Sequence, residues 1–244
     1  MAKPVASALR KEDIIQRLEE IVTLIDQSAR WALQRRAVME AGNQILANLN
    51  VSHGMLSYNI LHQTLVRSLV LDVTSCFDWS KKYPPERQSK ASIEALYYYI
   101  TREGIADIFL ERARNFSSVI GNQHEEDCRE ALARISQNHA NCSQDPEFQR
   151  RLLTLRHLRD QRIAHNQFGT TPHAPTYAEL FQLLDVAKQF SADGLLAVLG
   201  RGQDYEGFEQ SAARSARDLW TRALAAGSIS AIEPIVLPRH VDNE

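Results

Sequence analysis

The chain has 244 residues, of which 44% are hydrophobic and 24% are charged, as in globular proteins that bury a sizeable core. It carries 28 Lys and Arg against 30 Asp and Glu, and this net charge of −2 excludes a protein that coats nucleic acid through overall basicity. No apolar run approaches the roughly 20 residues of a membrane-spanning helix, and the first residues lack a signal-peptide core, so we expect a cytoplasmic protein without membrane contact.

Helical periodicity begins near the N-terminus and dominates the first third of the chain. Between residues 11 and 49, apolar side chains recur every three or four positions, as one buried helical stripe requires. A second stripe follows Ser52, a suitable cap, and ends near Asp78. Two prolines and several polar residues then predict a loop over 79–92.

The rest of the chain has the same helical pattern. We expect a third helix over 92–116 with Ser92 as its cap, and a shorter one over 125–139. Asp145 followed by Pro146 is a strong start signal for a fifth helix, which would end near His165. Thr176 would cap a sixth helix that ends at Leu199, and a seventh would span 208–226.

No segment alternates apolar β-branched and polar residues as a strand would. The sequence therefore predicts an all-α antiparallel bundle of about seven helices in one domain over 1–226, with its core at about 10–200. Residues 227–244 would form an extended or disordered tail. We also expect the C-terminal helix to be an appendage, and the long first helix to extend from the bundle and pair with another subunit.

The fifth predicted helix carries an unusual concentration of positive charge. Residues 147–166 hold five arginines and two acids, a local balance of +3; the arginines are Arg150, Arg151, Arg156, Arg159 and Arg162. Clustered guanidinium groups complement phosphate. His165 lies at the end of this run, and the ordinary pKa of histidine, about 6.5, suits acid–base chemistry.

A histidine beside arginines can cleave a phosphodiester. The base accepts a proton from the attacking oxygen, and an arginine stabilises the charge that grows in the transition state. RNA supplies its own nucleophile, the 2′-hydroxyl, so this chemistry requires no metal or cofactor. On a straight helix, however, Arg159 and His165 are about 120° out of alignment, whereas Arg162 and His165 lie close together. Either the helix changes before His165, or a second chain completes the site.

The segment "RDQRIAH" at 159–165 resembles the signature of the HEPN superfamily. That signature is an arginine, a polar residue after it, and a histidine four to six positions beyond the arginine. The stretches at 65–78, 92–100 and 158–166 are similar to those of the abortive-infection branch of the superfamily. The resemblance extends over roughly residues 10–200.

This resemblance implies a helical bundle that forms a homodimer, in which two signature helices build one composite cleft. It also implies a metal-independent endoribonuclease of toxin–antitoxin or phage-defence systems, with RNA as substrate and an antitoxin protein as a possible partner. Carried over to this chain, His165 would be the acid–base residue, Arg159 the phosphate contact, and Asp160 the residue that orients one of them. Contacts to RNA would come from neighbours on the same helix: Arg156, Arg162 and Asn166. Gln167 stands where nucleotide-regulated HEPN toxins carry tyrosine, which argues against that regulation.

Each of these features also has a purely structural interpretation. His165 could simply complement the negative end of a helix dipole. The arginines could form a solvated face in which Arg156 pairs with Asp160, and Arg150 and Arg151 fit that interpretation best. Other polar and aromatic groups are open to the same interpretation: Arg67 with Asp72 as a buried or a surface pair, Tyr97–Tyr99 as packing residues rather than a stacking surface, and the three cysteines as unpaired structural residues that bind no metal.

Three functions therefore compete. The first is an endoribonuclease, and the low overall charge then favours an exposed RNA loop, such as that of a tRNA, over a long RNA held through many phosphates. The second is a catalytically silent domain that binds RNA or nucleotide. The third is a helical scaffold whose basic face meets an acidic protein partner.

Overall fold

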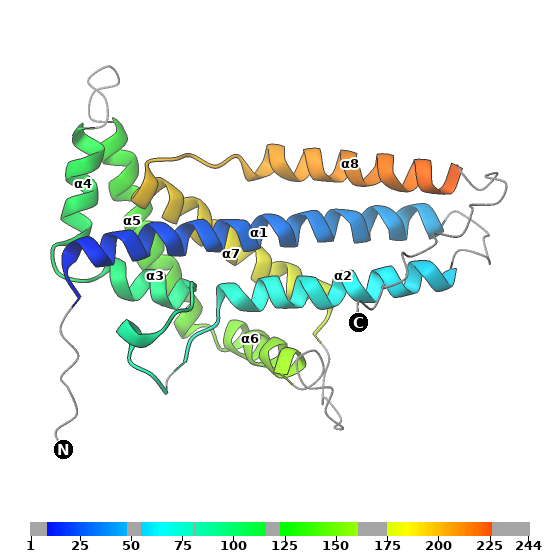
Figure 1. Ribbon diagram of the computed structural model, residues 1–244, viewed down its shortest axis with the longest axis horizontal. Coiled ribbons are helices and arrows are strands. Elements are labelled where there is room, and N and C mark those ends of the chain that lie inside the picture. The colour runs from blue at the N-terminus through cyan, green and yellow to red at the C-terminus, as the bar shows by residue number, and fades with distance from the viewer. Residues whose placement is uncertain (1–8, 48–54, 81, 116–122, 161–174, 226–244) are drawn as a thin grey trace, which may run out of the picture.

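The computed structural model describes residues 9–47, 55–80, 82–115, 123–160 and 175–225. These residues form eight α-helices and one short 3-10 helix, with no strand among them, which confirms the predicted all-α bundle (Figure 1). None of the described helices is long and apolar enough to cross a membrane. The elements in chain order are α1 (Lys11–Ala47), α2 (Met55–Cys76), η1 (Pro85–Arg87), α3 (Ile93–Ile100), α4 (Ile105–Asn115), α5 (Gln123–Gln144), α6 (Pro146–Leu158), α7 (Tyr177–Leu199) and α8 (Tyr205–Ala225).

The long helix α1 lies at the centre of the bundle. It packs against α2, α7 and α8, and near its N-terminal end against α3. Figure 1 shows α8 and α2 running along opposite sides of α1, with α7 crossing it. Its fully buried side chains are Leu18, Val22, Ile25, Ala29, Ala32 and Leu33. The expectation that α1 extends from the bundle is therefore wrong, because the helix packs against other helices of its own chain.

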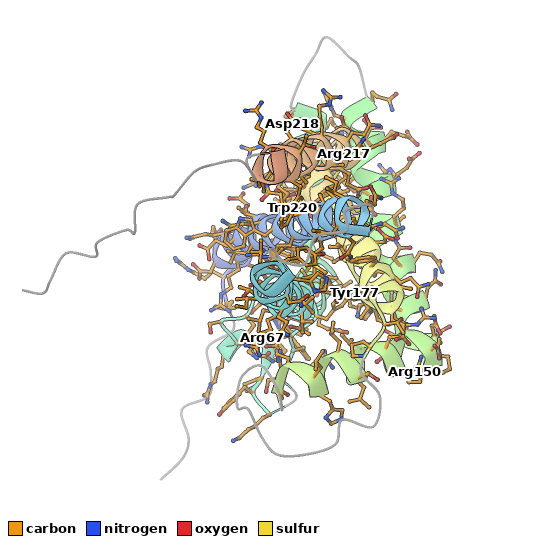
Figure 2. The ribbon with its side chains drawn as sticks, turned by 90° about the vertical axis from the view of Figure 1, so that its right-hand side faces the viewer. Arg67, Arg150, Tyr177, Arg217, Asp218 and Trp220 are labelled. Carbon is orange, nitrogen blue, oxygen red and sulfur yellow. The ribbon has the colours of Figure 1, made fainter. Side chains whose placement is uncertain are left out.

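Helix α8 is packed rather than appended. Trp220 is only 8% exposed and inserts between α8 and α1, where its indole N–H donates to the carbonyl oxygen of Val38 at 2.8 Å (Figure 2). At the other end of the helix, the Tyr205 hydroxyl contacts Asp26 of α1 at 2.7 Å and Ser191 of α7 at 2.8 Å. These contacts correct the expectation of a C-terminal appendage for residues 205–225. The tail at 227–244 lies outside the described residues.

The helix starts follow the sequence closely. The Asp145 side chain accepts from the backbone N–H of Glu147 at 2.8 Å, with Pro146 in the first turn of α6. Thr176 and Glu179 form a complete capping box at the start of α7, and Ser92 caps α3. Each such cap typically stabilises a helix by about 1 kcal/mol, which is why these positions can be recognised in the sequence.

The predicted helix over 92–116 is instead two helices. Gly104 has a φ of 72°, a left-handed conformation that other residues rarely adopt, and it separates α3 from α4. After this break α4 turns to pack against α5. Two other helices are longer than expected: α5 extends to Gln144, and α8 begins at Tyr205.

Gly194 marks the closest approach of α7 to the centre of the bundle. A Cβ atom at this position would lie 2.9 Å from Cγ1 of Val22 and 3.3 Å from Cδ2 of Leu96. We predict that Gly194→Ala lowers the free energy of unfolding by about 1–3 kcal/mol through overpacking. At an unhindered helix position the same change would raise it by about 1 kcal/mol.

Urea denaturation would measure this effect, and a higher unfolding midpoint for Gly194→Ala would contradict it. In a Val22→Ala background the nearest methyl groups are gone. The penalty of the second substitution should then shrink, as a double-mutant cycle would show.

Asp72 on α2 forms an ion pair with Arg35 of α1, not with Arg67, so the predicted Arg67–Asp72 contact is wrong. The Asp72 side chain is only 13% exposed. Burial raises the pKa of its carboxyl to about 6, and the nearby Arg35 charge offsets only part of that rise. The ionised pair therefore lies in an environment that disfavours the carboxylate.

This raised pKa predicts a pH-dependent contribution to stability. An unfolded Asp titrates near pH 3.9, so the folded chain holds the proton more tightly between about pH 4 and 6. The contribution of Asp72 is full below that window and is lost as pH rises through about 6. The stability of Asp72→Asn relative to the native chain should therefore increase from about pH 4 to 7, by at most about 3 kcal/mol. Parallel stability profiles for the two proteins would contradict this.

Candidate functional site

The described part of the predicted signature begins where α6 ends. Helix α6 buries Phe148, Leu152 and Leu155, and the Phe148 ring packs edge-on against Phe77 beyond α2, with ring centroids 5.7 Å apart. This contact fixes the end of α2 against α6. The helix ends at Leu158, and the backbone N–H of Arg159, still in a helical conformation, donates to the carbonyl oxygens of Leu155 and Arg156.

Arg159 is held between two carboxylates. One guanidinium nitrogen lies 3.2 Å from Oδ2 of Asp78, and Nε donates to Oδ1 of Asp160 at 2.7 Å. The same Oδ2 of Asp78 accepts a hydrogen bond from Nζ of Lys90 at 2.5 Å. We call these four residues the Asp78 cluster. It joins the end of α2, the loop before α3 and the end of α6.

The charges of the cluster reinforce one another. Burial alone would raise the pKa of Asp78, but the hydrogen bond from Lys90 and the charge of Arg159 outweigh it and lower that pKa. Burial likewise acts to lower the pKa of Arg159, and Asp160 and Asp78 reverse the direction. Asp78 and Arg159 therefore each hold the other in the charged form at neutral pH. The Arg159 side chain remains 20% exposed, so it can still meet a ligand.

Arg156 has a different environment. It is half-buried, and its guanidinium donates to the carbonyl oxygen of Phe77, which ties α6 to the end of α2. Burial lowers the pKa of Arg156. Asp160 forms its ion pair with Arg159 rather than with Arg156, so the predicted pairing at i,i+4 is not the one observed.

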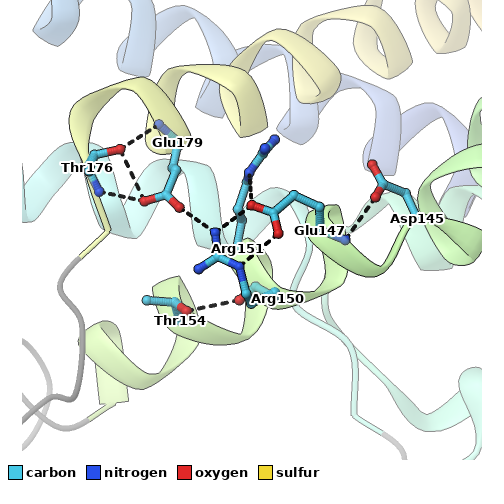
Figure 3. A network of polar contacts seen from close by, with 7 residues as sticks. All are labelled: Asp145, Glu147, Arg150, Arg151, Thr154, Thr176 and Glu179. Atoms are coloured by element: carbon cyan, nitrogen blue, oxygen red, sulfur yellow. Dashed lines mark hydrogen bonds and ion pairs between the residues drawn. The ribbon is translucent and has the colours of Figure 1, made fainter.

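The first half of α6 uses its arginines for structure (Figure 3). Arg150 bridges Glu147 and Glu179, with its Nη2 2.5 Å and 2.7 Å from the two carboxylates, and so links α6 to α7. Its hydrogen bond is the main reason that the pKa of Glu147 falls to about 2. Arg151 approaches Glu147 at 3.4 Å. These contacts agree with the structural interpretation of both arginines.

The structure also shows the surroundings of the tyrosines and cysteines that the sequence analysis singled out. Tyr99 is buried, and Tyr97 stacks on His139 of α5 with ring centroids 3.7 Å apart, so both act in packing. The cysteines are unpaired, and no group of metal-binding side chains occurs in the described ranges.

The structure brings Arg159, Asp160 and Arg156 to one end of α6. Arg162, His165 and Asn166 lie outside the described residues. The sequence analysis did not find Asp78 and Lys90. Their place in the cluster depends on contacts between residues far apart in the chain, which the sequence does not reveal. The signal that could have found them was an acid at a helix end followed by a basic loop.

The family of the chain can now be stated. A family model described as AbiU2, of the HEPN group, matches residues 15–219. The chain belongs to the HEPN-AbiU2 family. The match spans most of α1 through most of α8 and includes the whole Asp78 cluster, so the elements that build the cluster are part of the HEPN-AbiU2 domain. Neither the curated proteins nor the solved structures that were compared give a match.

Arg156 and Arg159 have different contacts, so their substitution by alanine should lower the free energy of unfolding by different amounts. Arg156→Ala leaves the Phe77 carbonyl without this donor and should lower the free energy of unfolding by about 1–3 kcal/mol. Arg159→Ala leaves Asp78 paired with Lys90 and should cost under about 1 kcal/mol. Thermal or urea unfolding of the two variants would test this order. A larger loss for Arg159→Ala would contradict the assignment of Arg156 as the structural residue.

Proposed function

We propose that this chain is a metal-independent endoribonuclease of toxin or phage-defence type. The observation that carries the proposal is Arg159, partly exposed at the end of α6 and oriented by Asp78 and Asp160. It stands at the first position of the family signature, whose histidine is His165. A guanidinium held in one orientation is suited to a phosphate, because it offers two donors in a fixed plane.

The proposed reaction is transesterification within the RNA. The 2′-oxygen attacks the adjacent phosphorus while His165 accepts its proton, and the bond from phosphorus to the 5′-oxygen breaks. A second histidine, from the partner subunit, would protonate that leaving oxygen. Arg159 would stabilise the charge on the non-bridging oxygens as it grows. Asp160 and Asp78 would act as positioning residues.

A homodimer in which two α6 helices face each other would bring the two histidines together. Such an interface would cover Leu153, an apolar side chain of α6 that is 55% exposed. Leu153→Glu should then shift the protein toward monomer on size-exclusion chromatography with light scattering. A dimer that persists in Leu153→Glu would contradict this interface.

The target that we favour is an exposed RNA loop, such as that of a tRNA. A net charge of −2 offers few cations for a long phosphate backbone, whereas a loop requires only a few contacts. The family context of toxins also makes an antitoxin protein a candidate partner.

One observation favours a second function. Arg159 already pairs with two carboxylates, which compete with a phosphate for its guanidinium. A site with this property could bind RNA or nucleotide without cleaving it, or hold a protein partner. The catalytically silent domain is therefore the alternative to the nuclease.

Cleavage of total RNA by the purified protein in EDTA tests the proposal. The native chain should cleave, and Arg159→Ala and His165→Ala should each lose at least about 100-fold in rate, the usual contribution of such groups.

Two substitutions serve as matched controls: Arg217→Ala, an exposed arginine on α8, and Arg67→Ala, an exposed arginine on α2 (Figure 2). Both should keep nearly full activity. Cleavage that survives in His165→Ala would refute the mechanism, and RNA binding without cleavage by any variant would favour the silent domain.

A further inference from the structure

A second basic surface adjoins the Asp78 cluster. It is the loop over 82–92, which carries three cations and one acid: Lys82, Arg87, Lys90 and Glu86. Glu86 is neutralised within the fold, because it accepts from the Tyr98 hydroxyl and pairs with Arg102 of the turn after α3 at 3.3 Å. The free charge of this loop is therefore positive on a chain whose net charge is −2.

The cations of the loop project from a firmly held backbone. The Gln88 side chain accepts from the Ser80 N–H at 3.0 Å and donates to the carbonyl oxygens of Ser80 and Tyr83 at 2.8 and 2.9 Å. Arg17 of α1 donates to the carbonyl oxygen of Glu86 at 3.1 Å. The loop is thus ordered before any ligand arrives, which lowers the entropy cost of binding.

Arg87 and Lys82 have no acidic partner among the described residues. Both are exposed, and the Tyr83 ring between them in sequence is 53% exposed, with the Lys82 ammonium 5.5 Å from its centroid. Unpaired cations next to an exposed aromatic ring match the pattern of proteins that bind single-stranded nucleic acid. In such proteins the cations contact phosphates, and the ring stacks on a base.

The loop and α1 enclose a groove of about 300 Å³. Its charged walls are Arg17 and Glu20 of α1 and Glu86, Arg87 and Lys90 of the loop. Lys82 and Tyr83 lie on the same loop but outside the groove. Lys90 connects this groove to the Asp78 cluster, because Lys90 and Arg159 contact the same oxygen of Asp78. In Figure 1 the loop lies beneath α1, on the same side of the bundle as α6.

We propose that the exposed surface of the loop over 82–92, together with the groove between this loop and α1, binds the single-stranded RNA that flanks the phosphate held by Arg159. Arg87 and Lys82 contact successive phosphates, Tyr83 stacks on a base, and Lys90 joins the groove to the cluster. The inference rests on the proposed function for the identity of the ligand, and it extends the RNA contacts beyond α6. An acidic protein partner is the competing occupant.

The test uses the full chain with His165→Ala, so that cleavage cannot interfere, and a short fluorescein-labelled single-stranded RNA. Fluorescence anisotropy would give Kd over a range of KCl concentrations. Lys82→Gln with Arg87→Gln should weaken binding roughly tenfold or more. It should also reduce the slope of log Kd against log salt by about 0.7 for each phosphate that the variant no longer neutralises. Tyr83→Ala should weaken binding about tenfold, and Tyr83→Phe should not.

The matched control is Arg214→Gln with Arg217→Gln, which changes the net charge equally. Both arginines are exposed on α8, and Figure 2 shows Arg217 on the side of the bundle away from α6. Equal weakening by the two double variants, or no weakening by the loop variant, would overturn the groove and point to the protein partner.

The proposed RNA-binding groove and the proposed nuclease activity can be refuted separately. If the native chain does not cleave RNA but the loop variant alone loses binding, the nuclease is refuted and the groove remains. If the native chain cleaves and the loop variant binds RNA normally, the groove alone is refuted. In an active enzyme the loop variant should raise KM with kcat nearly unchanged, whereas Arg159→Ala should lower kcat.

Discussion

The burial of α1 is the constraint on which the remaining structure depends. The 37-residue helix α1 packs against α2, α7 and α8, and small side chains allow close approach along its second half. Alanines at 29, 32, 37 and 41 and the glycine at 42 provide this room, and the indole of Trp220 lies against Gly42. Because the helices are in close contact here, substitutions near α1 that create a cavity or add volume should lower the free energy of unfolding.

The same packing determines where the site forms. Helix α2 reaches its end against α6, where Phe77 meets Phe148 and Arg156 binds the Phe77 carbonyl. Asp78 is the next residue, so its carboxylate is placed by the hydrophobic contact beside it. Arg159 lies one helical turn beyond the buried Leu155, and its guanidinium contacts that carboxylate. Apolar packing thus supplies the precision that the charged groups need.

Local signals explain what could be predicted from the sequence. The caps at Ser92, Asp145 and Thr176 are short-range interactions, and the apolar stripes indicate burial directly, so the helices could be recognised. The break at Gly104 could not, because a single glycine within a helical pattern does not reveal its φ. Within the candidate site, the contact between Arg159 and Asp160 could be expected, because the two residues are adjacent in the chain.

The contacts that the sequence did not reveal are long-range. Asp78, Lys90 and Arg159 come together only through the packing of α2, α3 and α6, and no periodicity encodes that meeting. Arg35 and Asp72 are a similar case, since Arg67 is nearer in sequence but projects to solvent. Sequence spacing along one helix therefore predicts ion pairs poorly where a neighbouring helix offers a buried partner.

The shared oxygen of Asp78 has a consequence for how the site would respond to ionic strength. If RNA binds as proposed, a phosphate at Arg159 would release cations condensed on the nucleic acid, and where it displaces a carboxylate it would also free a group that attracts cations from solution. The two exchanges oppose each other. Arg159 would therefore contribute less to the salt dependence of affinity than an unpaired arginine such as Arg87. Under the proposed function, high salt would therefore weaken the contacts of the loop to the strand before it weakens the contact of Arg159 to the phosphate.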